Sequence, residues 1–182
     1  MHHLAMKLAA LAMTGGTALA LTAAPAMASV TGPETAFGAV YGKAAAVNNP
    51  VIPLTWRGLV NAHGSFSPNG PAPKKGQHHT FNTSAGKLTV VVTAPPANYA
   101  SVNTKACHFS ATTYVDFAAV GSRSTGKFAG LSGLGAVKVN FAGYGPRYKS
   151  GQHKGQCNTS PNAPELAKGA VAAFLFSAVL TA

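Results

Sequence analysis

Three acidic side chains are all that the chain offers for carboxylate chemistry: Glu34, Asp116 and Glu165. A glycosidase needs two carboxyl groups that face each other across the scissile bond. Calcium and magnesium sites need several hard oxygen ligands. Three acids so widely spaced along the chain assemble neither arrangement easily. We therefore expect neither a glycosidase nor a site for these cations.

A hydrolytic triad would have to combine Asp116 with a histidine and a serine. The chain has no Gly-x-Ser-x-Gly turn of the kind that presents a nucleophilic serine in α/β-hydrolases. We interpret Asp116 as a solvated or salt-bridged residue of a strand, and the sequence identifies no catalytic residue.

Seven histidines raise the question of a metal site. His78 and His79 are adjacent, so in an extended segment they point to opposite faces and do not chelate together. A site made of His63, one of that pair and His153 is geometrically feasible. It lacks both an acid and the ligand spacing that is typical of structural zinc. We interpret these residues as exposed loop histidines and predict no metal site and no cofactor.

The first residues indicate the compartment. A start with the single cation Lys7 is followed by an apolar stretch over residues 8–21, and Ala26-Met27-Ala28 is a small-x-small cleavage pattern. The apolar stretch is shorter than the roughly 20 residues that cross a bilayer. We predict that residues 1–28 are a signal peptide cleaved after Ala28. The protein is then secreted, and the mature chain has no transmembrane segment.

Two cysteines, Cys107 and Cys157, lie in the exported part. In an oxidising compartment such a pair typically forms a disulfide. The bridge would close a loop of about 50 residues and contribute roughly 4 kcal/mol of stability. A nucleophilic or metal-bound thiol is the alternative, and no Cys-x-x-Cys spacing supports it. We predict the disulfide.

Basic side chains dominate the charge, with 14 Lys and Arg against three acids. Loss of Lys7 with the signal peptide leaves a net charge of +10. Exposed basic loops attract polyanions over a long range. For a secreted protein we expect extracellular polyanions or cell-wall polymer as the partner, rather than nucleic acid. The alternative is that the charge only keeps the protein soluble. The candidate residues come from two loops: Lys74 and Lys75 beside His78 and His79, and Arg147, Lys149 and Lys154 beside His153.

The composition favours strands and turns, since 20 Gly and 12 Pro accompany only 9% charged residues. Residues 51–66 are β-rich, with Trp56 as an expected core anchor. Residues 80–83 and 87–94 form an expected hairpin that turns at 84–86. The clearest alternation runs from 107 to 117, and a second runs from 136 to 141. The face of the first that we expect to be buried carries Cys107, Phe109, Ala111, Thr113, Val115 and Phe117.

The two ends of the exported chain are less regular. Residues 29–50 show no sustained period, so we expect a flexible leader with a short helix near 42–47, ahead of a domain over 51–182. Residues 169–182 are apolar on both faces, which fits a strand buried on both sides or a short helix.

Residues 121–135 read Gly-Ser-Arg-Ser-Thr-Gly-Lys-Phe-Ala-Gly-Leu-Ser-Gly-Leu-Gly. They resemble a recurring turn of allene oxide cyclase and dirigent barrels, Gly-Gly-Thr-Gly-x-Phe followed by Gly-x-x-Gly, although Ser122 to Gly126 depart from its tight form. The layout also resembles small secreted bacterial proteins of unknown function with two similarly placed cysteines. The resemblance implies an all-β fold, a single antiparallel β-barrel or closed sandwich. The structural residues of this turn would be Gly126, Phe128, Gly130, Gly133 and Gly135.

Such a turn specifies a corner and no catalyst. Gly126 and Gly130 can adopt positive φ, and Phe128 can fill the interior between strands. We therefore expect a secreted, non-catalytic extracellular or cell-surface binding protein of unknown ligand and oligomeric state. The alternative, implied only by the resemblance, is a cyclase- or isomerase-like enzyme or a binder of small apolar ligands. It would need an open barrel cavity of about 300 Å³ or more.

Overall fold

The fold is taken from a computed structural model that describes residues 29–45, 50–67, 73–158 and 168–182. This part of the chain contains no α-helix. Three short 3-10 turns connect strands: η1 (Gly42–Ala44), η2 (Gly121–Arg123) and η3 (Gly126–Phe128). The strands are β1 (Thr31–Tyr41), β2 (Ile52–Gly58), β3 (Ala62–Phe66), β4 (His78–Thr83), β5 (Gly86–Val92), β6 (Ala97–Asn103), β7 (His108–Val120), β8 (Ser132–Tyr144) and β9 (Lys168–Thr181).

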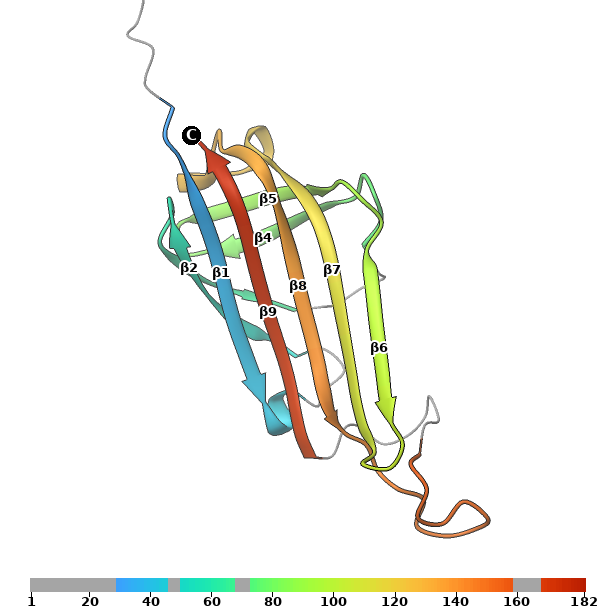
Figure 1. The fold of residues 1–182 in the computed structure, drawn as a ribbon. Coiled ribbons are helices and arrows are strands. Elements are labelled where there is room, and N and C mark those ends of the chain that lie inside the picture. The colour runs from blue at the N-terminus through green and yellow to red at the C-terminus, as the bar shows by residue number, and fades with distance from the viewer. Residues whose placement is uncertain (1–28, 46–49, 68–72, 159–167) are drawn as a thin grey trace, which may run out of the picture.

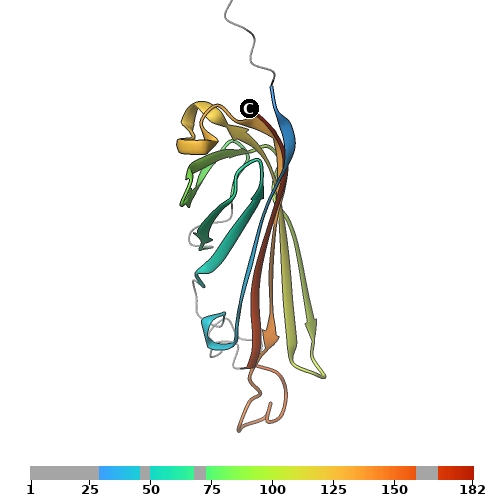
Figure 2. The ribbon, with the colours of Figure 1, turned by 90° about the vertical axis from the view of Figure 1, so that its left-hand side faces the viewer.

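Eight of these strands close into an antiparallel barrel. Their order is β5-β4-β3-β2-β1-β9-β8-β7, and pairing between β5 and β7 completes the ring. The long strands β1, β9, β8 and β7 lie side by side (Figure 1). Figure 2 shows the shorter strands β2 to β5 facing that long sheet and ending well above its lower end. The predicted all-β antiparallel barrel is therefore confirmed.

Strand β7 belongs to two neighbours. Residues 117–119 pair with β5 inside the ring, whereas residues 108–114 pair with β6, which lies outside it. This division corrects the buried face expected for residues 107–117. Val115 and Phe117 are buried, but Ala111 is exposed, because this half of β7 continues beyond the closed ring.

Aromatic rings fill the interior of the barrel. Trp56 is 1% exposed, and its ring centroid lies 5.7 Å from that of Phe81, 5.6 Å from Phe128 and 4.8 Å from Phe176. Phe176 also stacks on Phe117 at 4.8 Å. Rings from β2, β4, β7, β9 and η3 thus meet in one cluster, and Trp56 is the core anchor that the sequence suggested.

The corner between β7 and β8 supplies one of these rings. Gly126 has φ +64° and packs against the β4–β5 turn, where a Cβ atom would lie only 2.2 Å from the carbonyl oxygen of Ala85. Gly130 has φ +80°. Between them Phe128 is fully buried. The glycines let this segment approach the neighbouring turn closely enough to direct Phe128 into the barrel.

Both ends of the described chain form central strands. Residues 31–41, expected to belong to a loose leader, instead form β1, which pairs with β9 at every position from Thr31 to Tyr41. Val40 is the one large hydrophobic residue on its inner face, beside Glu34, Ala36 and Gly38, so hydrophobicity shows little alternation. For residues 169–182 the sequence left open a strand buried on both sides or a short helix, and the structure shows a strand. Its inner face is buried, whereas Leu175 and Val179 on the other face are exposed.

Candidate functional site

Among the described residues, the titratable side chains Glu34 and His79 face the interior of the barrel. Glu34 is fully buried, and one of its oxygens, Oε2, accepts a hydrogen bond of 2.9 Å from the backbone N–H of Val60 in the β2–β3 turn. Its other oxygen, Oε1, is buried without a partner. Burial raises the pKa of Glu34, and the backbone hydrogen bonds from Val60 and Leu59 oppose that rise. Glu34 therefore fixes the turn, at the expense of placing an acid inside the barrel.

The raised pKa gives a pH-dependent prediction. Because the folded protein holds the proton of Glu34 more tightly than the unfolded chain, stability is full below the ordinary pKa of 4.5 and is lost as the pH rises through the folded value. Glu34→Gln keeps an oxygen for Val60 and cannot ionise. We expect the melting temperature of this variant, relative to the wild type, to increase from pH 4 to pH 8.

The prediction compares Glu34→Gln with the wild type because His79 also makes stability depend on pH. Burial lowers the pKa of His79, whose Nε2 is buried without a partner, so His79 adds stability as the pH rises. That effect is common to both proteins and cancels in their difference. A difference that stays constant from pH 4 to pH 8 would show that folding does not shift the pKa of Glu34.

Neither Glu34 nor His79 lies in a cluster of described residues that could hold a metal ion. Among the described residues no group of three His, Cys, Asp or Glu side chains lies close enough to hold a metal ion. His63, His78 and His153 are exposed, while His79 is partly buried in β4 opposite Val90. Asp116 is exposed on β7 and is not buried with either interior group.

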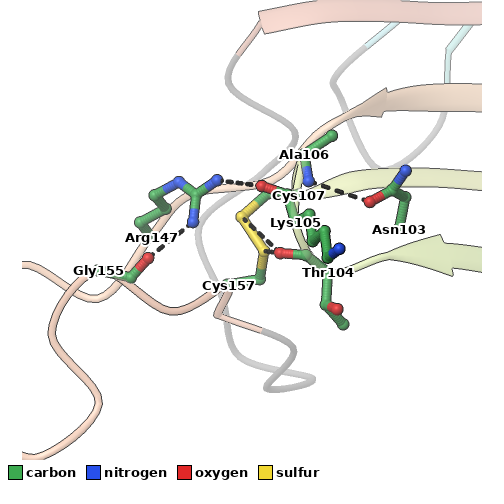
Figure 3. The surroundings of a disulfide bond; sticks show 8 residues. All are labelled: Asn103, Thr104, Lys105, Ala106, Cys107, Arg147, Gly155 and Cys157. Carbon is green, nitrogen blue, oxygen red and sulfur yellow. Dashed lines mark hydrogen bonds between the residues drawn. A yellow bond between two sulfur atoms is a disulfide. The ribbon is translucent and has the colours of Figure 1, made fainter.

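A surface feature with several anchoring contacts is the segment 145–158 after β8, which extends from the lower end of the long sheet (Figure 1). The predicted disulfide between Cys107 and Cys157 is present, with Cα atoms 5.3 Å apart (Figure 3). It ties this segment to the β6–β7 turn. Backbone hydrogen bonds from Gly145 to Cys107, at 2.8 Å, and from Asn158 to Pro146, at 2.9 Å, close its base.

Arg147 holds the same junction by a different means. Its guanidinium donates one hydrogen bond of 2.7 Å to the carbonyl oxygen of Gly155 and another of 2.6 Å to that of Lys105 (Figure 3). Both acceptors are neutral, so the positive charge is not cancelled. Arg147 thus connects the 145–158 segment to the β6–β7 turn, and it also places a positive charge at that junction.

The lysines at this end have no acid beside them in sequence. Lys105, Lys149 and Lys154 are exposed, and neither residues 97–107 nor residues 143–158 contain a carboxylate side chain. We call Lys105, Arg147, Lys149 and Lys154 the basic end. Lys105 was missed by sequence reasoning, although it lies two residues before a cysteine whose predicted bridge connects it to the other three.

The second basic loop lies elsewhere. Gly76 donates a hydrogen bond of 2.8 Å to Val92, and Thr93 donates one of 2.9 Å to Asp116, so exposed Lys74 and Lys75 lie near that level of β7. The turn that carries Lys105 joins β7 at His108, eight residues before Asp116 in the chain. At about 3.3 Å per residue, the two levels are roughly 26 Å apart. The structure therefore groups Arg147, Lys149 and Lys154 with Lys105, but does not bring Lys74 and Lys75 to them.

Comparison with known proteins adds no family to this description. The chain matches no protein-family model, no curated protein and no solved structure. Among the described residues, no helix has the length and apolar character needed to cross a membrane. The predicted signal peptide lies outside the described residues.

Proposed function

We propose that this is a secreted, non-catalytic binding protein whose basic end contacts anionic polymers of the extracellular surface. The observation that supports this best is a set of four cations on two segments without a single acid, held in one place by a disulfide and by Arg147. A fixed cluster of cations attracts a polyanion without having to be ordered first, so less entropy is lost on binding.

The barrel interior supports the alternative function less well. A cyclase-like enzyme or a binder of apolar ligands needs room inside the ring, and the rings of Trp56, Phe81, Phe128 and Phe176 occupy that position and pack against one another. A relationship to allene oxide cyclase and dirigent barrels is also part of the proposal. It is supported by the closed eight-stranded ring and by the glycine-rich corner at 121–135.

The test compares two triple variants that remove equal charge. Lys105→Gln/Lys149→Gln/Lys154→Gln removes the lysines of the basic end and leaves the two hydrogen bonds of the Arg147 guanidinium intact. Binding to soluble polyphosphate should weaken, and the slope of log affinity against log salt should fall by about 3, because each lysine that no longer pairs with a phosphate lowers it by about one. Melting temperatures should hardly change, since exposed lysines contribute little to folding.

The matched control is Lys74→Gln/Lys75→Gln/Lys87→Gln, which removes three exposed cations away from the basic end. It should keep most of the wild-type affinity and salt slope. Equal losses in both triple variants would mean that the net charge acts diffusely. Absence of wild-type binding at low salt would leave solubility as the role of the charge.

A further inference from the structure

Strand β6 is an edge strand with few of the usual protections. It pairs with β7 at seven consecutive positions from Ala97 to Asn103, and no other described strand pairs with its far edge. All seven residues are exposed. Monomeric proteins usually protect such an edge with lysine, proline or a bulge. The segment Ala-Asn-Tyr-Ala-Ser-Val-Asn has no charge and no proline, and its register is unbroken.

The ladder shows which backbone groups of β6 are free. Thr93 donates to the carbonyl oxygen of Asp116, so the peptide groups of Asp116 face the side of β7 on which β6 lies. In an antiparallel ladder the direction alternates with each residue. The β6 residues bonded to β7 are therefore Ala97, Tyr99, Ser101 and Asn103. The intervening residues, Asn98, Ala100 and Val102, direct their N–H and C=O groups outward.

Both ends of this free edge are set by the chain. Pro95 and Pro96 precede β6 and offer no N–H for pairing. After β6, the side-chain oxygen of Asn103 accepts a hydrogen bond of 3.0 Å from the backbone N–H of Ala106, which begins the turn to β7. The available edge is thus seven residues long, and Ala100 is its midpoint.

We propose that β6 is the interface of a symmetric dimer, in which the β6 strands of two copies pair antiparallel about Ala100. A two-fold axis at this point sets Ala100 opposite Ala100 and Asn98 opposite Val102. All three outward residues of each copy then find partners, giving about six hydrogen bonds. No other register uses them all. A copy of the same chain satisfies the edge by its own symmetry, and the uncharged strand is where two copies of a strongly basic protein meet with least repulsion.

The interface is small, so we expect an equilibrium between monomer and dimer at micromolar protein concentration. Sedimentation velocity over a range of concentrations should show it. Dimerisation should strengthen as salt rises, since salt screens the repulsion between two positive copies. Polyanion binding at the basic end should respond to salt in the opposite sense, so the two proposals can fail independently.

Charge substitution at the axis tests the register directly. Ala100→Lys and Ala100→Glu each place two like charges opposite one another, and each variant should be monomeric at concentrations where the wild type is dimeric. An equimolar mixture should form a heterodimer, because Lys then meets Glu. The same pair of substitutions at Val102, which faces Asn98 across the axis, should show no such rescue. Because Ala100 is exposed and does not bond to β7, circular dichroism spectra should match the wild type.

Three results would overturn the proposal. The wild type could remain monomeric at every concentration reached. The dimer could persist in Ala100→Lys, which would place the interface on another surface, such as the exposed outer face at Leu175 and Val179. The mixture of Lys and Glu variants could fail to associate, which would exclude a pairing centred on Ala100.

Discussion

Trp56→Ala is expected to lower the free energy of unfolding by about 4 kcal/mol, as for other large aromatic residues removed from a packed core. Trp56 is the only tryptophan, is 1% exposed, and contacts rings from three other elements. These elements are β4, η3 and β9, so its removal leaves a cavity where distant parts of the chain meet. Urea unfolding followed by far-ultraviolet circular dichroism measures the loss.

Trp56→Phe provides the matched comparison. It keeps a ring among Phe81, Phe128 and Phe176, and it removes the indole N–H, which is buried without an acceptor. Removing an unsatisfied donor offsets part of the stability that the smaller ring forfeits in packing, so we expect a cost well below that of the alanine variant. If the two substitutions cost the same, ring packing is not what makes this position important. A cost below about 1 kcal/mol for Trp56→Ala would show that the cluster is not the core of the fold.

The sequence predicts individual strands better than their neighbours. Alternation from 107 to 117 correctly indicates a strand, because side-chain period reflects local backbone geometry. Which residues become buried depends on where the ring closes. That point is set by β5 meeting residues 117–119 of β7, whereas β6 occupies residues 108–114. Such pairings between separated segments leave no mark in the alternation itself, so Ala111 could not be recognised as exposed.

Strand β1 shows the opposite failure. Of its inner positions only Val40 carries a large hydrophobic side chain, and at Gly38 a Cβ atom would lie 1.8 Å from the carbonyl oxygen of Pro53. The requirement at this position is close approach of two backbones and not hydrophobicity. A hydrophobic pattern therefore cannot reveal β1. The buried state of Glu34 has the same cause, since only the pairing of β1 with β2 and β9 places it inside.

The candidate site was predictable to the extent that it depends on covalent and charged residues. The cysteine pair indicated the bridge, and the charges indicated the segment around Arg147, Lys149 and Lys154. The structural role of Arg147 could not be predicted from the sequence. Its acceptor at Lys105 lies 42 residues away and is a backbone carbonyl, which every residue has. A substitution of Arg147 would therefore remove both a positive charge and the hydrogen bonds that connect the 145–158 segment to the β6–β7 turn.

Cys107→Ser/Cys157→Ser is expected to lower the free energy of unfolding by about 4 kcal/mol, and the melting temperature by roughly 12 °C. The bridge joins residues 50 apart in sequence, so its removal returns a long loop to the freedom of the unfolded chain. The dependence of stability on urea should also become steeper, because the unbridged unfolded state exposes more surface. Scanning calorimetry and urea titration measure the two effects.

The same variant separates the stability of the barrel from the order of the basic end. Residues 145–158 would then be held to the β6–β7 turn by Arg147 and by the backbone hydrogen bond from Gly145 to Cys107, without a covalent link. Amide exchange should accelerate within this segment because its local anchoring is weakened. Amides of β8 and β9 that exchange only through global unfolding should accelerate no more than the fall in the free energy of unfolding requires, since their ladder does not involve the bridge. Polyphosphate binding should weaken in parallel with the loss of protection, since the cations would have to be ordered on binding.

Two thiols that titrate in the native wild-type protein, or an unchanged melting curve in the variant, would contradict the role given to the bridge. Unchanged binding despite faster exchange would mean that charge alone, and not its fixed placement, determines the affinity of the basic end.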